Sequence, residues 1–94
     1  MASTNLPIDS FLQTLRDNRS SESNFSTLQQ ELDKAIAAAG QSGETNLVTD
    51  LQEIKEKYIP EYENALSAGS TAWPAYEKFV TQFERVLIGA GKAA

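Results

Sequence analysis

Carboxylates are the side chains through which this chain would have to do chemistry. It has 13 Asp and Glu residues and no histidine or cysteine, so it lacks the commonest general base and any thiol nucleophile or thiolate ligand. Catalytic carboxylates need burial to shift their pKa. Glu53 and Glu56 share one helical face, but they are expected at exposed positions among lysines. They therefore predict a solvated face, and we expect the protein not to be an enzyme.

Sequence patterns that bind metals or nucleotides are also missing. A di-iron bundle needs paired Glu-x-x-His motifs, and a calcium loop needs regularly spaced oxygen ligands. The sequence contains neither of these. The glycine-rich phosphate-binding patterns and the GxSxG nucleophile elbow do not occur either. We therefore expect no cofactor and no metal.

One short stretch, IDSFLQTL, resembles the attachment site of acyl carrier proteins, with Ser10 in the place of the modified serine. Carriers have a whole helix and a long loop before that serine, whereas only nine residues precede Ser10 in this chain. The stretch therefore predicts the first turn of a helix, in which Asp9 interacts favourably with the helix dipole.

The charge balance restricts the kinds of partner. A formal net charge of −5 opposes nonspecific binding to nucleic acid and to anionic lipid, and it suits a basic protein partner. No stretch approaches the roughly 20 apolar residues of a membrane span. The N-terminus lacks the basic region and apolar core of a signal peptide. We expect a cytoplasmic protein, or one exported without a classical signal peptide.

Four segments with helical periodicity must position these side chains. Apolar residues recur at three- and four-residue steps in segments from Pro7 to about Asn18, from Phe25 to Ala39, from Leu47 to Leu66, and from about Ala72 to Ile88. Gly40 is expected to cap the second helix at its C-terminus. The sequence predicts an all-α fold, a small antiparallel up-down bundle whose first segment is short. The alternative is a three-helix bundle with the N-terminal helix packed across it. Residues 1–94 are expected to form one domain, with 1–6 and 89–94 as flexible tails.

Pro60 lies inside the third segment. It cannot donate a hydrogen bond to the carbonyl of Glu56, which costs about 3 kcal/mol within a helix. The apolar spacing from Ile54 to Leu66 nevertheless keeps step across the proline. This spacing favours a single helix kinked at Pro60. The alternative is two helices that meet at Ile59.

The third and fourth segments bring several aromatic residues to one end of the predicted bundle. The short turn SAGST makes these two helices antiparallel neighbours. Tyrosine and tryptophan either pack into a core with their polar tips satisfied or form the centre of a protein-binding patch. The candidates for partner binding, with the acidic face included, are Tyr58, Tyr62, Trp73, Tyr76, Glu53 and Glu56.

These observations favour a non-enzymatic protein-binding module, such as an adaptor, an inhibitor or an immunity-type protein. Its acidic surface would suit a basic partner protein. The alternative is a self-assembling structural or secreted subunit. Val86, Leu87 and Ile88 are consecutive, and they offer more apolar surface than one helical stripe can bury. Self-association is therefore the second kind of partner interaction that the sequence suggests.

Two segments resemble known secreted proteins. GETNLVTDLQEIKEKYIPEYENAL resembles the turn and second helix of type III secretion needle subunits, with glycines in place of their proline-bounded turn. The region of Trp73 resembles the small dimeric helical hairpins secreted by the type VII route, with Trp-Pro-Ala in place of their Trp-x-Gly turn. Neither resemblance covers enough of the chain to name a family.

Overall fold

The protein is an all-α bundle. The computed structural model describes residues 7–93. Its helices are α1 (Ile8–Asn18), α2 (Phe25–Gln41), α3 (Thr45–Ser67) and α4 (Trp73–Ala93), with the short 3-10 helix η1 (Glu22–Asn24) between α1 and α2. This confirms the predicted all-α class with four helical segments, of which the first is short. Helix α4 continues past Ile88, the predicted end of the fourth segment, as far as Ala93. The predicted tail at 1–6 lies outside the described residues.

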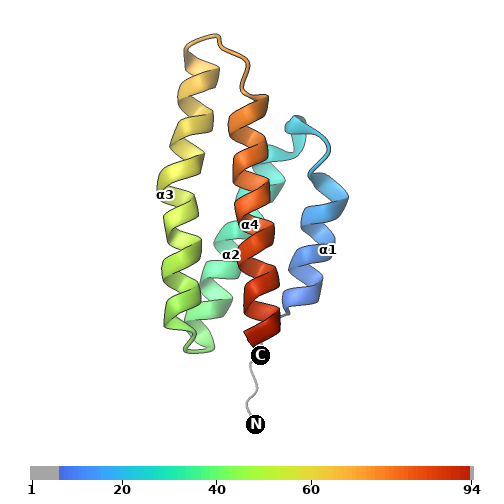
Figure 1. The fold of residues 1–94 in the computed structure, drawn as a ribbon, viewed down its shortest axis with the longest axis vertical. Helices are drawn as coiled ribbons and strands as arrows, with labels where there is room; N and C mark the ends of the chain where they lie inside the picture. Colours follow the sequence, from blue (N-terminus) through green and yellow to red (C-terminus); the bar gives the residue numbers. More distant parts are fainter. Residues whose placement is uncertain (1–6, 94) are drawn as a thin grey trace.

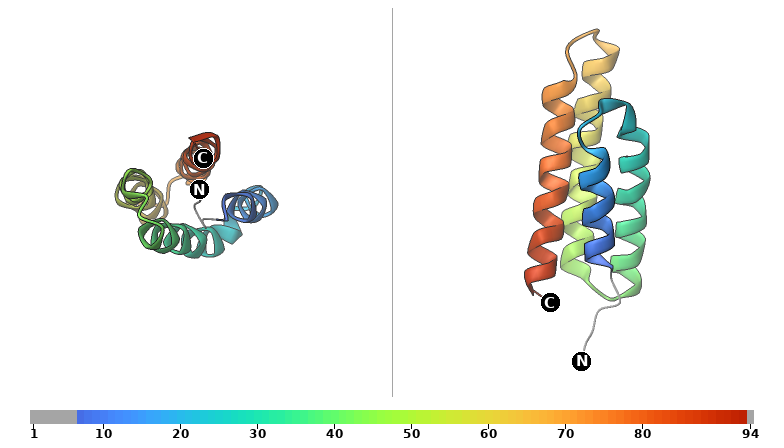
Figure 2. Two further views of the ribbon diagram at one scale, coloured as in Figure 1. Left: turned by 90° about the horizontal axis from the view of Figure 1, so that it is seen from below. Right: turned by 90° about the vertical axis from the view of Figure 1, so that its right-hand side faces the viewer.

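The four helices pack side by side around a common core. In Figure 1, α1 and α3 ascend while α2 and α4 descend. The end-on view in Figure 2 places α4 opposite α2, with α3 on one side and α1 on the other. Helix α1 lies alongside α4 and α2 and does not cross over the other three. Helices α3 and α4 project beyond the connection between α1 and α2 (Figure 1).

The core takes apolar side chains from every helix. Helix α1 contributes Phe11 and Leu15, and α2 contributes two leucines together with Ala35 and Ala39. The small alanines of α2 leave room for a neighbouring helix to come close. The largest fully buried side chains are Leu15, Leu28, Leu32, Leu51, Tyr76, Phe79, Val80, Phe83 and Leu87.

Helices α2 and α3 end in the same way, at a glycine with left-handed backbone angles. Gly43 has a φ of 73°; its N–H donates to the Gly40 carbonyl at 3.2 Å, and the Glu44 N–H donates to the Ala39 carbonyl at 2.9 Å. This pair of hydrogen bonds defines the Schellman motif, and glycine is favoured there because it has no Cβ. Gly69 plays the same part after α3, with a φ of 73°. The expectation that Gly40 caps α2 is wrong: the helix continues to Gln41, and the left-handed residue is Gly43.

Helix α3 runs without interruption through Pro60 from Thr45 to Ser67. The alternative of two helices that meet at Ile59 is therefore not what the structure has, while the predicted kink stays a prediction. The buried stripe of α3 does change at this point. Ile54 is followed in the core by Ile59, a step of five residues, and Tyr58 is only half-buried. The five-residue step falls at the turn where Pro60 has no N–H to donate.

Candidate functional site

The structure brings three of the four predicted aromatic residues together at one end of the bundle. The ring centroid of Tyr76 lies 5.3 Å from that of Trp73 and 6.0 Å from that of Tyr62. Phe25, at the start of α2, completes the cluster, since its ring centroid is 4.2 Å from that of Tyr62. Tyr58 forms no ring pair with the other three, and the Nζ of its neighbour Lys57 lies 5.6 Å from its ring centroid.

Tyr76 belongs to the core of this cluster. Its side chain is fully buried, and its hydroxyl donates to the backbone carbonyl of Ser21 at 2.9 Å and to that of Asn18 at 3.3 Å. Burial raises the pKa of the Tyr76 hydroxyl; nearby Arg19 opposes this rise and Glu22 adds to it. The hydroxyl therefore holds the connection between α1 and α2 against α4.

Tyr62 makes a similar contact to the connection between α1 and α2, from α3. It is 5% exposed, and its hydroxyl donates to Oε2 of Glu22 at 2.9 Å. Burial, followed by the hydrogen bond to Glu22, raises the pKa of Tyr62 to about 12. Tyr62 and Tyr76 thus satisfy their polar tips within the protein, from two different helices, on one short connection. In this fold neither tyrosine presents its ring to a partner.

Trp73 lies on the outside of the cluster. It is 38% exposed, and Leu66 on α3 is 52% exposed; among the described residues these are the exposed large apolar side chains. They flank the turn that joins α3 to α4, at the projecting end of the molecule (Figure 1). Leu66 was expected in the buried stripe of α3. It lies next to the last residue of α3, in the part of the helix that projects beyond the connection between α1 and α2 (Figure 1).

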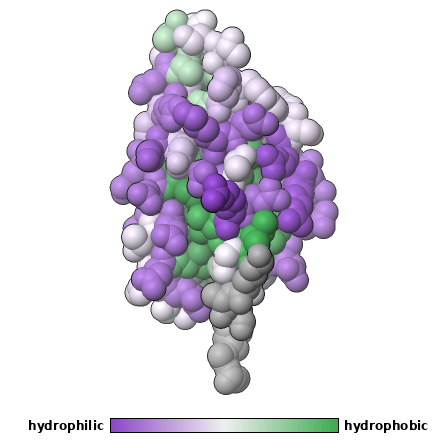
Figure 3. Space-filling model, in the orientation of Figure 1, coloured by the Kyte–Doolittle hydropathy of each residue, from purple (hydrophilic) through white to green (hydrophobic). Residues whose placement is uncertain are grey.

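The segment that carries both residues has no charge. Residues 64–76, NALSAGSTAWPAY, contain no Asp, Glu, Lys or Arg, although charged residues make up 22% of the whole chain. We call this segment the tip. In Figure 3 the projecting end is white and pale green, and below it purple side chains surround a green area in the middle and lower part of this face. The tip therefore forms an uncharged end of the molecule.

The acidic candidates lie elsewhere. Glu53 and Glu56 are exposed on α3, away from the aromatic cluster. Glu56 lines a shallow depression of about 600 Å³ between α2 and α3, together with Asp33, Ile36, Ala37, Gln52 and Lys55. Lys55 crosses from α3 to α2, where its Nζ lies 2.9 Å from Oδ1 of Asp33. The two helices that line this depression are thus already joined by an ion pair.

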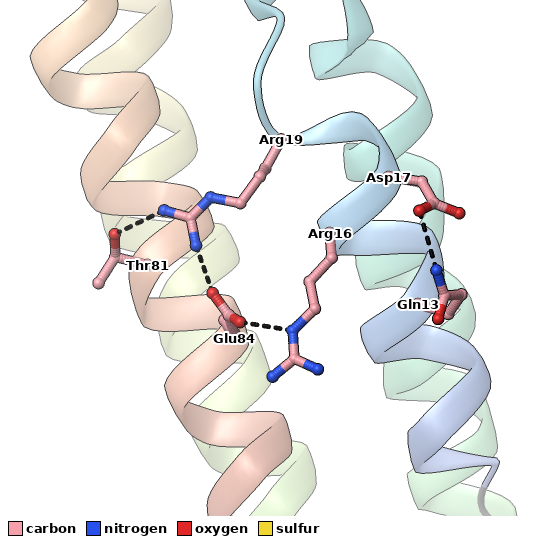
Figure 4. Close-up of polar contacts among 6 residues, drawn as sticks. All are labelled: Gln13, Arg16, Asp17, Arg19, Thr81 and Glu84. Carbon is pink, nitrogen blue, oxygen red and sulfur yellow. Dashed lines mark hydrogen bonds and ion pairs between the residues drawn. The ribbon is translucent and has the colours of Figure 1, made fainter.

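A polar contact that the sequence analysis missed joins α1 to α4. Glu84, whose side chain is 17% exposed, accepts from Nε of Arg16 at 2.8 Å and also from Nη1 of Arg19. Nη2 of Arg19 lies 3.4 Å from the hydroxyl of Thr81 (Figure 4). These residues lie more than 60 positions apart in the sequence, so no local spacing reveals the contact. It fastens the short helix α1 to α4.

The acidic side chains of the described residues form no metal-binding group. Across residues 7–93, no three Asp or Glu side chains converge to hold a metal ion. Over the same range, no buried side-chain nitrogen or oxygen lacks a hydrogen-bond partner. No helix between residues 7 and 93 is both long enough and apolar enough to cross a membrane.

The apolar run at the end of α4 is mostly covered by the protein itself. Leu87 is fully buried, Val86 packs against the core, and Ile88 is half-buried. A Cβ placed on Gly91 would lie 3.4 Å from Cγ2 of Ile8, so α1 also approaches this part of α4. The middle residue of the run that suggested a self-assembling subunit is therefore covered within a single chain, and its two neighbours are partly covered.

Comparison with models of known protein families found no match, and neither the curated proteins nor the solved structures contain a match.

Proposed function

We propose that this protein is a non-enzymatic protein-binding module that contacts its partner through the tip. One observation carries the proposal: the two large apolar side chains that are exposed within residues 7–93, Leu66 and Trp73, flank one turn in an uncharged segment at the projecting end of the bundle. Tryptophan is enriched among the residues that dominate binding energy at interfaces. Exposed apolar side chains gathered at one place on a charged surface are a mark of an interaction site.

The packing beneath Trp73 favours binding. Its ring lies against Tyr76, with the centroids 5.3 Å apart. The Tyr76 hydroxyl is held in turn by the carbonyls of Ser21 and Asn18. A side chain that is already supported loses less conformational entropy when a partner covers it. The buried Tyr76 thus positions Trp73.

The experiment that tests this proposal is capture of a partner from extracts of the source cell by the immobilised full chain. The variant with Leu66→Ser and Trp73→Ser removes both exposed apolar side chains, and circular dichroism verifies that the bundle is retained. We expect a partner that the unmodified chain captures and this variant does not. The control variant, Glu53→Gln with Glu56→Gln, should capture the same partner. Loss of the partner with the control and its retention with the tip variant would contradict the proposal.

The self-assembling alternative leads to a different measurement. It depends on the run from Val86 to Ile88 being available to another chain. Leu87 is fully buried in its own core, whereas Val86 and Ile88 are half-buried. Leu87→Ala should therefore lower the free energy of unfolding by about 2–5 kcal/mol without changing the state of association. Light scattering over a wide concentration range should give a constant molar mass. A mass that grows with concentration, and that falls in the Leu87 variant while the fold persists, would favour the assembling subunit.

A further inference from the structure

The tip is bordered by carboxylates. Glu63 stands three residues before Leu66 on α3, and Glu77 stands four residues after Trp73 on α4. Residues at these spacings are neighbours on a helix surface. Each exposed apolar side chain therefore has a carboxylate beside it, on the side away from the turn. Both glutamates are exposed, and within residues 7–93 neither forms an ion pair.

The basic residue closest to the tip along α4 does not cancel this charge. Nζ of Lys78 lies 3.0 Å from Oε2 of Glu61 on α3, so its charge is already matched by another carboxylate. The nearest basic residue along α3 is Lys57, which lies well below Glu63 and next to the ring of Tyr58. The border of the tip consequently carries a net negative charge around an uncharged apolar centre.

From this arrangement, and resting on the proposed function, we infer that the tip docks on an apolar protein surface bordered by lysine or arginine. At the centre of the tip, the apolar side chains of Leu66 and Trp73 would be removed from water by the partner surface. At the border, Glu63 and Glu77 would face the basic residues of the partner. Such complementary charges raise the association rate and disfavour partners that carry negative charge.

The same charges argue against the other occupants of such a surface. A second copy of this chain would present the same negative border, so that docking tip to tip would bring like charges together. An anionic lipid surface and a nucleic acid also repel carboxylates. A basic-bordered protein surface gains from both the apolar centre and the charged border.

Trp73 provides a direct readout, because it is the single tryptophan of the chain. The probes are two synthetic amphipathic helical peptides with identical leucine stripes, one flanked by lysines and the other by glutamates. We expect the Leu/Lys peptide to shift the Trp73 emission to the blue in a saturable titration. The Leu/Glu peptide should bind about tenfold more weakly or worse, which is the effect of two surface charge pairs of about 0.7 kcal/mol each.

Charge reversal at the border provides the matched variants. Glu63→Lys with Glu77→Lys should weaken binding of the Leu/Lys peptide about tenfold and strengthen binding of the Leu/Glu peptide. The control is Asp50→Lys with Glu53→Lys, which changes the net charge equally. Glu53 lies about 15 Å from Glu63 along the helix, beyond the screening length of about 8–10 Å at physiological salt. The control should keep its affinity for the Leu/Lys peptide within about twofold.

Several outcomes would overturn the inference. These are equal binding of the two peptides, no blue shift with the Leu/Lys peptide, and border variants that behave as the control does. A blue shift produced by phosphatidylcholine vesicles alone would assign the tip to a lipid surface, and one produced by concentrating the protein alone would assign it to a second copy. If partner capture still depends on Leu66 and Trp73 while the two peptides bind equally, the inferred role of the charged border is wrong and the proposed function stands. If capture does not depend on these residues, the proposed function itself fails.

Discussion

The two glycines at the end of α2 should respond in opposite directions to the same substitution. Gly40 lies inside the helix, and a Cβ added there meets nothing within 4 Å. Gly43 is equally open, but its φ is +73°. Replacement by alanine therefore changes only the backbone energetics at both sites, with no steric clash to confuse the comparison.

The magnitudes follow from the two backbone conformations. Alanine in a helix interior is favoured over glycine by about 0.8–1.0 kcal/mol, and somewhat less than this near a helix end such as Gly40. An alanine at Gly43 must adopt left-handed angles at a cost of about 1–2 kcal/mol. Gly40→Ala should thus raise the free energy of unfolding by about 0.5–1 kcal/mol. Gly43→Ala should lower it by about 1–2 kcal/mol.

Urea unfolding followed by far-UV circular dichroism measures both values. In a domain of this size, 1 kcal/mol corresponds to a change in Tm of about 4–8 °C, so the two variants should separate clearly in a thermal scan as well. Gly43→Asn should lower the free energy of unfolding by less than Gly43→Ala does, since asparagine tolerates the left-handed region. If Gly40→Ala destabilised the protein and Gly43→Ala did not, the cap would lie at Gly40 and our account of this turn would be refuted.

Three further predictions concern the interior of α3 and the contacts between helices. Pro60→Ala restores an N–H that can donate to the Glu56 carbonyl, so it should raise the free energy of unfolding by about 2 kcal/mol, the helix gain of about 3 less an unfolded-state term of about 1. The Tyr62 hydroxyl has its pKa raised from the ordinary 10.0 to about 12; its contribution to stability should be complete below pH 10 and be lost as the pH rises toward 12, a loss that Tyr62→Phe should reduce. Glu84→Gln weakens the link between α1 and α4 and should cost about 1 kcal/mol, less at high salt.

Each of these predictions has a control. The free energy of unfolding of Pro60→Ala should rise without loss of partner capture, and no rise at all would mean that the helix already accommodates the missing hydrogen bond. For Tyr62, unfolding in urea at pH 9 and pH 11 should differ more in the unmodified chain than in the phenylalanine variant. Glu61→Gln, at a more exposed ion pair whose glutamate is 42% exposed, should change stability by less than Glu84→Gln. Equal effects would show that the partial burial of Glu84 adds nothing.

Local pattern in the sequence was sufficient to predict the helices. Three- and four-residue spacing of apolar side chains indicated four helical segments and an all-α fold, since this periodicity depends only on the geometry of one helix. The same spacing predicted the wrong stripe around Pro60, where Ile59 is buried and Tyr58 is half-buried. It also placed the α2 cap at Gly40, because glycine content alone does not reveal which glycine takes left-handed angles.

The tertiary structure alone decided which residues of the candidate site are exposed. The sequence grouped four aromatic residues and left them either in the core or on a patch: Tyr58, Tyr62, Trp73 and Tyr76. The fold buries Tyr62 and Tyr76 beneath the α1–α2 connection, through hydrogen bonds that span 40 to 58 positions. It leaves Trp73 and Leu66 exposed at the tip. Periodicity shows which face of a helix is apolar. It does not show how far the neighbouring helices extend along that face, because their length and placement depend on distant segments of the chain. That extent decides which apolar residues are buried and which are exposed.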